Sequence, residues 1–396
     1  MGSGNRRVGV AERRARLATR HHLAPVSRGA ASPGGVGGAV ADIIALHGTD
    51  PASVYLAAWA RTGASRADIE HALYAEGALV RMLGMRRTVF VVPVSLMPVI
   101  QAACTDQIAE RLRRDLAKRV QESAIAADGA AWLDEVSQAT VRALAARGRA
   151  TGGELAGDEP RLRAQLVYAA PEGKSYGGPV NVTTRLLTLL SAEGLIVRGR
   201  PRGGWTSSQF TWTVAPDRPR PDAVAARAEL ARRWLHAFGP AAPADLQWWA
   251  GWTATQTRQA LGQLELAGVD LDGTAGVMLA ADQDVPAAEP WPALLPALDP
   301  AAMGWRDRGW YLGGHAAALF DRSGNIGPTA WWDGRIVGGW AQRKDGEIAL
   351  RLLEDAGAEA AAALAAEARR LREWLGDDET RITPRFRTPL ERELTG

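Results

Sequence analysis

The order of helical and strand-like patterns constrains the fold of this chain most. Its first part contains three helical patterns and then two strand-like runs, at about 38–47, 51–62, 66–75, 78–83 and 86–92. Apolar residues spaced three to four apart predict the helices, and two short apolar runs separated by Gly84 predict a β-hairpin. Three short helices followed by a hairpin are the order of a winged helix, a helix-turn-helix variant used largely for binding DNA.

The same order returns twice in the rest of the chain. After a long helical stretch at about 93–122, the second copy has helices and then strands at about 130–147, 153–156, 180–193, 195–198 and 209–214. The third copy has them at about 222–237, 243–250, 254–267, 269–271 and 277–280. Although the residues are not visibly repeated, three copies of one order predict three tandem winged-helix units.

The chain changes character from Trp291 onward. Strand-like runs alternate with turns that contain Gly and Asp, and they lie at 310–312, 329–332, 335–340 and 348–352. An alanine-rich helix at 358–374 follows. We expect a small β-barrel or curled sheet that is packed by one helix.

The predicted fold class is α+β and mainly α, with three tandem winged-helix units around a DNA-binding cleft and a C-terminal domain like a small β-barrel. A length of 396 residues exceeds what one hydrophobic core usually serves, so several modules are expected. We predict that the modules cover 1–125, 126–216, 222–290 and 291–396.

The composition excludes several classes of protein. No apolar run approaches the ~18 residues that span a bilayer, and the basic N-terminus lacks the hydrophobic segment of a secretory signal. We expect a cytoplasmic protein with no membrane partner. The single Cys104 excludes an internal disulfide framework and a multi-cysteine metal site, and the 6 histidines are scattered. Neither a metal nor another cofactor is implied.

Arginine supplies almost all of the positive charge. The net charge is only +3, and the lysines are Lys118, Lys174 and Lys344. A coding bias is one explanation, because alanine and glycine are also abundant. Guanidinium groups nevertheless bind phosphates bidentately and stack on bases, which suits a nucleic-acid partner whatever the origin of the bias.

A loop with polar side chains, His47-Gly48-Thr49-Asp50-Pro51, precedes the second predicted helix. Asp50 is a good N-cap, and Pro51 is a good first helical residue because it has no N–H to lose. Since side chains two residues apart in extended backbone share a face, His47 and Thr49 are predicted to point to the same side. The alternative is that Gly48 turns the chain and His47 only packs between two helices.

Six features in this order give the chain a family resemblance. They are an Arg-rich first helix at 13–23, the Asp-Pro loop before a helix that ends in Trp59-Ala60-Arg61, a strand at 85–90, a Gly/Arg/Trp hairpin at 199–205, the run 294–299 and the strand pair 333–340. Over nearly its whole length the chain resembles the bacterial winged-helix DNA glycosylases of the AlkZ and YcaQ type.

The resemblance implies tandem winged helices around a cleft for duplex DNA, and hydrolysis of the N-glycosidic bond of alkylated purines. In that family the catalytic pair belongs to a Gln-x-Gln or Gln-x-Asp motif just before the Asp-Pro cap. Here the matching positions hold His47 and Thr49, so the chain has neither the usual glutamine nor the alternative carboxylate. Arg61 and Arg87 match family arginines and are predicted DNA contacts, with structural ion pairing as the alternative.

The chemistry of glycosidic cleavage is compatible with His47 and Thr49 in place of the family's glutamine and its alternative carboxylate. The sugar passes through an oxocarbenium-like state, and a purine alkylated on its ring already carries a positive charge and leaves without protonation. Neutral His47 can accept a proton from water, and the hydroxyl of Thr49 can hold that water, so both are predicted to be catalytic. Asp50 is a candidate cleft residue that supplies negative charge. The alternatives are that His47 only holds a phosphate or that the site is inactive, and base flipping is left open.

The hairpin near residue 200 is the second candidate site. Arg198, Arg200 and Arg202 alternate along its tip, and Trp205 follows them. Arginines on a narrow ribbon neutralise phosphates and read groove width, so these four residues are predicted to bind DNA. The alternative is an ordinary solvated wing, but the matching hairpin of the family is thought to touch DNA.

The segment from Asp299 to Arg308 matches a family segment near the cleft. Asp299, Trp305 and Arg306 are therefore candidate cleft residues. Asp299 can also cap the turn that begins at Pro300. Trp305 can also belong to the core, as tryptophan usually does.

We predict a monomeric DNA-repair hydrolase, a monofunctional DNA glycosylase that removes alkylated or bulky purines from duplex DNA. The alternative is a non-catalytic winged-helix DNA-binding protein, either a lesion sensor or a transcriptional regulator. A third hypothesis is a protein-interaction scaffold. The glycosylase releases free base, the binding protein does not, and the scaffold shows no salt-dependent affinity for DNA.

Overall fold

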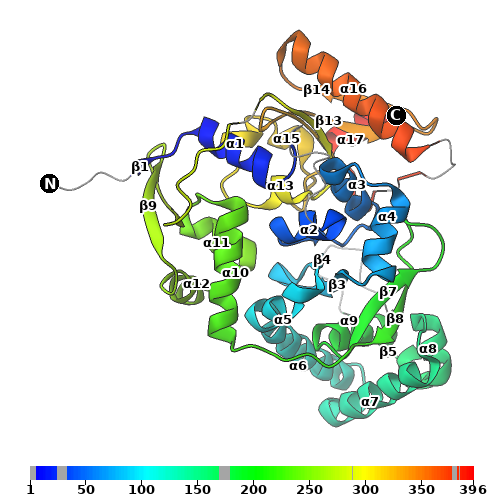
Figure 1. Ribbon diagram of the computed structural model, residues 1–396. Coiled ribbons are helices and arrows are strands. Elements are labelled where there is room, and N and C mark those ends of the chain that lie inside the picture. The colour runs from blue at the N-terminus through cyan, green and yellow to red at the C-terminus, as the bar shows by residue number, and fades with distance from the viewer. Residues whose placement is uncertain (1–5, 25–33, 169–178, 288, 377–380, 383) are drawn as a thin grey trace.

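The computed structural model describes residues 6–24, 34–168, 179–287, 289–376, 381–382 and 384–396 (Figure 1). Its first part contains α1 (Val10–Arg20), α2 (Gly35–Asp42), β2 (Leu46–His47), α3 (Pro51–Thr62), α4 (Arg66–Glu70), β3 (Leu79–Leu83) and β4 (Val89–Pro93). The predicted helix 38–47 ends early because Ile44 has a φ of 70°, outside the helical range. The residues after it form β2, which pairs with β4.

The second helix of this part begins and ends as the sequence predicts. Asp50 is its extended N-cap, with φ −99° and ψ 120°, and Pro51 is its first residue. Gly63 follows the last turn with a φ of 66°, the left-handed conformation that commonly ends a helix. Because α3 starts directly after the His47–Asp50 loop, its position fixes where that loop lies.

The middle of the chain repeats the order of helices and hairpin. It contains α5 (Met97–Ile100), α6 (Asp106–Glu122), α7 (Gly129–Arg147), α8 (Gly152–Asp158), β5 (Gln165–Leu166), β6 (Val180–Asn181), α9 (Val182–Ala192), β7 (Ile196–Pro201) and β8 (Phe210–Val214). The next part contains α10 (Ala223–Phe238), α11 (Pro243–Ala250), α12 (Ala254–Leu261), β9 (Leu266–Leu271) and β10 (Thr274–Leu279). A short strand, β1 (Arg6–Arg7), joins this last hairpin as a parallel neighbour of β9.

One detail of strand pairing recurs in all three parts. The residues between the first and second helix pair antiparallel with the second strand of the hairpin. This pairing joins β2 to β4, Ala150 to Trp212 in β8, and Ala241 to Val277 in β10. The three parts therefore share a strand connection as well as an order of elements.

The first two hairpins form one sheet. Its strand order is β2-β4-β3-β7-β8, and β3 and β7 pair antiparallel at Arg81 and Arg198. This single pairing brings the hairpin near residue 200 against the strands that hold the His47–Asp50 loop.

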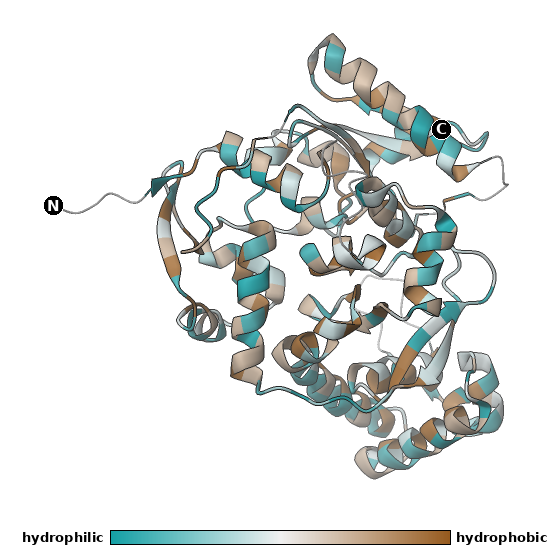
Figure 2. Ribbon diagram, viewed as in Figure 1, coloured by the Kyte–Doolittle hydropathy of each residue, from teal (hydrophilic) through white to brown (hydrophobic). Residues whose placement is uncertain are grey.

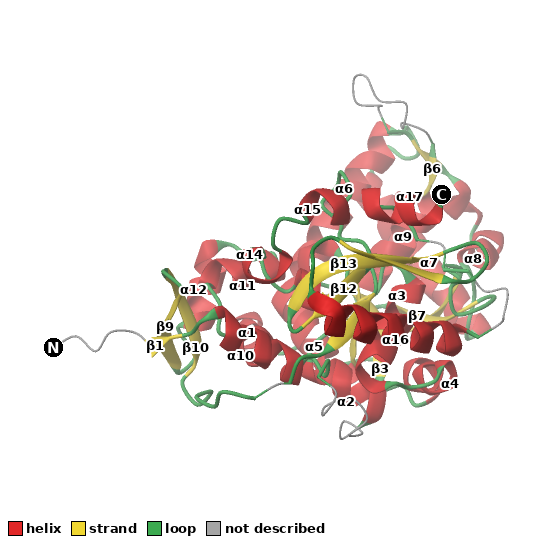
Figure 3. Cartoon of the chain, turned by 90° about the horizontal axis from the view of Figure 1, so that it is seen from above, coloured by secondary structure: helices red, strands yellow, loops and turns green. Residues whose placement is uncertain are grey.

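The C-terminal part contains β11 (Pro292–Leu295), α13 (Pro300–Met303), α14 (Gly309–Leu312), α15 (Ala316–Leu319), β12 (Thr329–Trp332), β13 (Arg335–Gln342), β14 (Ile348–Leu352), α16 (Gly357–Leu375) and α17 (Pro389–Thr395). Its four strands form an antiparallel sheet in the order β11-β12-β13-β14. Within the described residues β11 and β14 do not pair with each other, so the sheet is open and the predicted barrel is wrong. Figure 3 shows α16 against this sheet.

The run at 310–312 is a helix rather than the predicted strand. Trp310, Tyr311 and Leu312 are all buried in α14. A short apolar run that is buried on every side has no period to distinguish a strand from a helical turn. Its helical conformation is therefore a result of packing.

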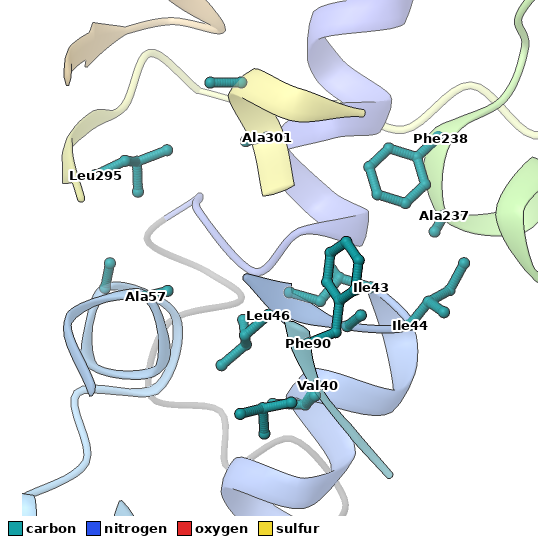
Figure 4. Close-up of a cluster of buried hydrophobic side chains, with 14 of the residues drawn as sticks. Val40, Ile43, Ile44, Leu46, Ala57, Phe90, Ala237, Phe238, Leu295 and Ala301 are labelled. Carbon is teal, nitrogen blue, oxygen red and sulfur yellow. The ribbon is translucent and has the colours of Figure 1, made fainter. Parts of the chain in front are cut away.

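The hydrophobic side chains form one large core and a smaller second core. The large core joins residues of α2, α3 and β4 to α10, α13 and β11, and Figure 4 shows Leu46, Phe90, Phe238 and Leu295 in it. The second core consists of side chains from α6 to β8, among them Leu133, Leu155 and Leu186. Burying each such side chain contributes about 1.5–3 kcal/mol. Helices that lie between a core and solvent, such as α10, carry both hydrophobic and hydrophilic residues (Figure 2).

Across the described ranges, every helix is too short or too polar to cross a lipid bilayer.

Candidate functional site

The loop His47–Asp50 is fixed by the hydrogen bonds of Gly48. The amide of Gly48 donates to Val89 O at 2.8 Å, and its carbonyl oxygen accepts from Arg81 Nη1 at 2.9 Å. A Cβ at this position would lie 3.0 Å from Phe90 C and 3.2 Å from Val89 O, so only glycine fits so close to β4. The loop thus lies against the sheet as an extended segment.

His47 lies between this sheet and a guanidinium group. The side chain of Leu46 is fully buried in the core (Figure 4), and alternation along β2 directs His47 away from it. The imidazole meets Phe90 edge-on at a centroid distance of 5.7 Å, and its Nδ1 is shielded from solvent without a hydrogen-bond partner among the described residues. Burial and the nearby charge of Arg86 lower the pKa of His47 to about 4. The ring is therefore neutral at physiological pH and keeps an unused nitrogen.

Thr49 forms part of the wall of a pocket of about 610 Å³, which we call the Thr49 pocket. Hydroxyl groups and guanidinium groups dominate its polar lining, which comprises Thr49, Thr151, Thr183, Thr184, Thr188, Ser208, Gln209, Arg198, Arg202 and Arg385. None of the described residues in this lining is Asp or Glu. The pocket therefore offers donors and positive charge, and it suits an anionic ligand.

Two further hollows are linked to the Thr49 pocket by shared lining residues. One of about 360 Å³, between α6 and α9, shares Thr188 with it. Another of about 220 Å³ shares Arg87, Leu112 and Asp115 with the first of these hollows. We call these three adjoining hollows the basic groove, because its described lining includes Arg87, Arg111, Lys118, Arg119, Arg185, Arg198, Arg202 and Arg385 and, as acids among the described residues, only Asp115 and Glu122.

The basic residues of α6 and α9 were not predicted as site residues. Arg119 and Arg185 approach Tyr168 from these two helices, with guanidinium-to-centroid distances of 4.8 and 5.5 Å. A basic pair on either side of an aromatic residue is a common arrangement for binding nucleic acid. The sequence signal was the high arginine content of α6, whereas α9 carries Arg185 as its one arginine.

Asp50 lies apart from the Thr49 pocket. Its carboxylate accepts a hydrogen bond from Ser53 Oγ at 2.9 Å, and burial raises its pKa. It lines a separate cavity of about 30 Å³ together with Ser53 and Glu391. The structure therefore gives Asp50 a role in holding the start of α3.

Arg61 and Asp299 do not face a cleft, which corrects the prediction for both. The side chains are 1% exposed and 0% exposed, and they form a bidentate ion pair with N–O distances of 2.7 and 2.9 Å. Asp299 Oδ1 also accepts from Ala301 N at 2.9 Å, so it caps the turn at Pro300. Two buried opposite charges need each other, because either one alone would be costly to desolvate.

Trp205 and Trp305 are core residues, and their predicted contact with DNA or the cleft is wrong. Trp205 is 7% exposed and lies between Tyr55 and Trp374, at ring distances of 5.2 and 5.8 Å. Trp305 is 2% exposed and donates its indole N–H to Phe238 O at 3.0 Å. Large aromatic surfaces contribute most when they are removed from water, which explains both positions.

The arginines of the predicted hairpin separate into two directions. Arg198 and Arg202 line the Thr49 pocket, and Arg202 also pairs with Glu154. Arg200 instead pairs with Glu70 at 3.1 Å, and its guanidinium lies 5.4 Å from the centre of the Tyr74 ring. Regular alternation would put all three side chains on one face, so the separation follows from the irregular pairing of β7 with β8 between Arg198 and Pro201.

Arg87 and Arg306 are both exposed but lie in different surroundings. Arg87 occupies the turn between β3 and β4 with a φ of 58° and lines two hollows of the basic groove. Arg306 is fixed through its backbone amide, which donates to Asp245 Oδ1 at 3.0 Å. It lines none of the three hollows.

A basic groove suits an anionic partner, and comparison with known proteins supplies the class. The chain belongs to the DNA glycosylase AlkZ-like family, whose model matches residues 40–374. Its class is therefore that of DNA glycosylases, hydrolases of the bond between base and deoxyribose in DNA repair, as the sequence predicts.

Among solved structures, the chain is similar to the Streptomyces sahachiroi DNA glycosylase AlkZ. The TM-score is 0.71, with 20% sequence identity over 93% of this chain and 97% of that chain. This similarity shows a shared fold. No curated protein matches the sequence.

Proposed function

We propose that the protein hydrolyses the N-glycosidic bond of alkylated or bulky-adduct purines in duplex DNA, with His47 and Thr49 in the catalytic positions. The observation that carries the proposal is the Thr49 pocket. Thr49, Arg198 and Arg202 line this pocket, and His47, two residues before Thr49 in the same loop, carries a neutral imidazole that lies outside the described lining. A phosphate backbone neutralised by these arginines would bring the sugar toward the loop.

The reaction needs an acceptor for one proton. Water attacks C1′ of the sugar, the C–N bond breaks, and its electron pair neutralises the cationic purine as it leaves. The water proton passes to His47, whose pKa of about 4 makes it a base of roughly carboxylate strength without a negative charge. Thr49 orients the water through its hydroxyl.

The lining of the pocket favours a purine that is already cationic. An unmodified purine must be protonated before it leaves, which requires a general acid beside the base. The described residues that line the Thr49 pocket include no carboxylic acid and no histidine. A purine alkylated on its ring needs no such acid, so this class of substrate fits the residues present.

The arrangement of the fold supports recognition of a duplex. We propose that the three parts with the recurring strand pairing are tandem winged-helix units, since a winged helix has this order of helices and strands. The module boundaries predicted from the sequence are part of the proposal. We also propose a monomer that acts in the cytoplasm, where the buried thiol of Cys104 stays reduced.

The test is release of free base from duplex DNA that contains N7-methylguanine. Wild type should release base, His47→Ala should lower the rate at least 100-fold, and Thr49→Ala should lower it less. Both variants should bind the duplex nearly as wild type does. Arg392→Ala is the control, because Arg392 is exposed on α17 and lines none of the three hollows. Binding without release by wild type, across a panel of alkylated duplexes, would favour the non-catalytic alternative.

A further inference from the structure

The last residues of the chain form a strap across the catalytic loop. We define the C-terminal strap as residues 381–382 and 384–396, which follow α16 and lie beyond the residues matched by the family model. The sequence marks it only by four arginines, Arg381, Arg385, Arg387 and Arg392. The proposed reaction has so far used none of them.

The strap is attached to the C-terminal sheet on both sides of Arg385. Before it, the amide of Ile382 donates to Gln342 Oε1 at 2.9 Å. After it, Thr388 and Glu391 form a capping box at the start of α17, and Leu390 is 2% exposed. Leu390 lies so close to β13 that a Cβ on Gly339 would come within 2.7 Å of it. Arg385 is therefore carried by a segment of defined position.

Between these attachments the strap passes the His47–Asp50 loop. Pro384 and Arg387 line the small cavity at Asp50, and Arg385 lines the Thr49 pocket. The side chain of Arg385 is exposed. In the part of the chain that the structure describes, no carboxylate lies within ion-pair distance of it.

Arg198 is the second cation of this pocket without a carboxylate partner. Its guanidinium contacts only aromatic faces, at 5.5 Å from the Phe210 centroid and 5.2 Å from that of Trp212. Burial first, and then the charges of Arg81 and Arg385, lower the pKa of Arg198 to about 10. Like charges this close repel one another in the free protein.

A third arginine adds to the same excess of positive charge. Arg81 is 2% exposed, and its Nε and Nη2 atoms have no hydrogen-bond partner among the described residues. Its remaining nitrogen holds the carbonyl oxygen of Gly48. Asp50 interacts electrostatically with Arg385 and Arg81 from its separate cavity, but the described residues that line the pocket itself include no acid, so an anion that enters the pocket adds compensation for the three guanidinium groups.

We propose that Arg385 of the C-terminal strap and Arg198 of β7 form a phosphate subsite that holds a phosphodiester of the substrate strand beside Thr49. The proposal rests on the proposed function, because it assumes that DNA occupies the Thr49 pocket. Two guanidinium forks on opposite elements bind phosphate oxygens, and the hydroxyl groups of Thr183, Thr184 and Ser208 add donors to the same wall. Arg385 is thereby a positioning residue, which fixes the sugar next to the catalytic pair.

The test compares Arg385→Ala, Arg385→Lys and the charge-matched control Arg392→Ala in the full chain. The affinity for an unmodified duplex is measured by fluorescence anisotropy at several salt concentrations. Each phosphate contact contributes about 0.9 to the slope of log affinity against log salt. Arg385→Ala should reduce that slope by about one, Arg385→Lys should restore it, and Arg392→Ala should leave it unchanged. Thermal unfolding confirms that each variant is folded.

A second measurement, the kinetics of base release, distinguishes a role of Arg385 in positioning the substrate from a general contribution of its positive charge. On alkylated duplex, Arg385→Ala should raise KM and Arg385→Lys should recover only part of the loss, because ammonium lacks the planar fork. An unchanged slope in Arg385→Ala, or an equal loss in Arg392→Ala, would overturn the proposal. The slopes need no catalysis, so they decide this question even if wild type releases no base and the proposed function fails.

Discussion

Arg81 Nη1 donates a hydrogen bond to the carbonyl oxygen of Gly48, with an N–O distance of 2.9 Å. Since the amide of Gly48 donates to Val89 O on the neighbouring strand, both polar backbone groups of this glycine are paired. The loop that carries His47 and Thr49 is therefore held by β3 and β4 rather than by its own side chains. Rigid placement of this kind is what a site needs to orient one water molecule.

Replacing Gly48 by alanine should displace the loop. The new Cβ would lie 3.0 Å from Phe90 C, so the backbone of β4 or the loop has to shift by a few tenths of an ångström. We expect Gly48→Ala to lower the free energy of unfolding by about 1–3 kcal/mol and to lower base release more than 10-fold. Urea unfolding and base-release rates measure the two effects.

Gly157→Ala is the matched control for this substitution. A Cβ at Gly157, in α8, meets nothing within 4 Å, and alanine favours a helix. This variant should be as stable as wild type or more stable by about 0.5–1 kcal/mol, with unchanged base release. If Gly48→Ala and Gly157→Ala had the same free energy of unfolding and the same rate of base release, Gly48 would not be tightly packed.

The environment of His47 predicts how the protein responds to pH. Burial, and second the charge of Arg86, lower its pKa to about 4 in the folded state, below the ~6.5 of an unfolded chain. The unfolded state therefore binds more protons between these values, so His47 contributes to a loss of stability as pH falls from about 6.5 to 4. Base release should stay constant between about pH 5.5 and 8, whereas an ordinary histidine would lose half its base form near 6.5.

Arg86→Gln tests the cause of that shift. Removing the guanidinium should raise the His47 midpoint in an NMR titration, but burial should still keep it below 6.5. Arg392→Gln removes an exposed charge elsewhere and should not move the midpoint. A wild-type midpoint near 6.5 would contradict the buried position of the ring.

The Arg61–Asp299 pair should matter for stability and not for DNA. Asp299→Asn leaves the guanidinium of Arg61 buried without a counter-charge, which should lower the free energy of unfolding by about 3–5 kcal/mol. The affinity of the folded variant for duplex DNA should not change at a temperature well below its Tm.

The exposed pair Arg351–Glu393 supplies the comparison. Both side chains are more than half exposed, so Glu393→Gln should cost at most about 1 kcal/mol. Thermal and urea unfolding of both variants check this difference. If Asp299→Asn lost DNA affinity while its stability was unchanged, Asp299 would have to contact DNA in the cleft, contrary to this prediction.

The basic groove predicts which exposed arginines contact DNA. Arg185→Ala, on α9, should reduce the slope of log affinity against log salt by about one, because Arg185 lines the groove next to Tyr168. Arg306→Ala should leave the slope unchanged, because Arg306 lines none of the three hollows. Anisotropy titrations at several salt concentrations measure both, and the reverse result would exclude α9 from the interface.

The parts of the fold that depend on local pattern were predictable. Apolar residues at helical spacing, followed by a glycine, predicted the observed bounds of α3 and α11. Two apolar runs separated by a glycine predicted the hairpin of β3 and β4. The prediction failed where local pattern carries no information. Trp310–Leu312 is apolar at every position, and an open sheet differs from a barrel only in whether its two edges meet.

The sequence by itself determined the order of helices and strands, the position of the loop before α3, and which functional groups, an imidazole and a hydroxyl, that loop carries. Only the tertiary structure decided which charged residues are available to a substrate. Arg61 is neutralised by Asp299, which is 238 residues away, whereas Arg385 reaches the Thr49 pocket from the end of the chain. The sequence shows that an arginine carries a positive charge, but whether that charge is desolvated and which counter-ion it has depend on contacts between distant segments.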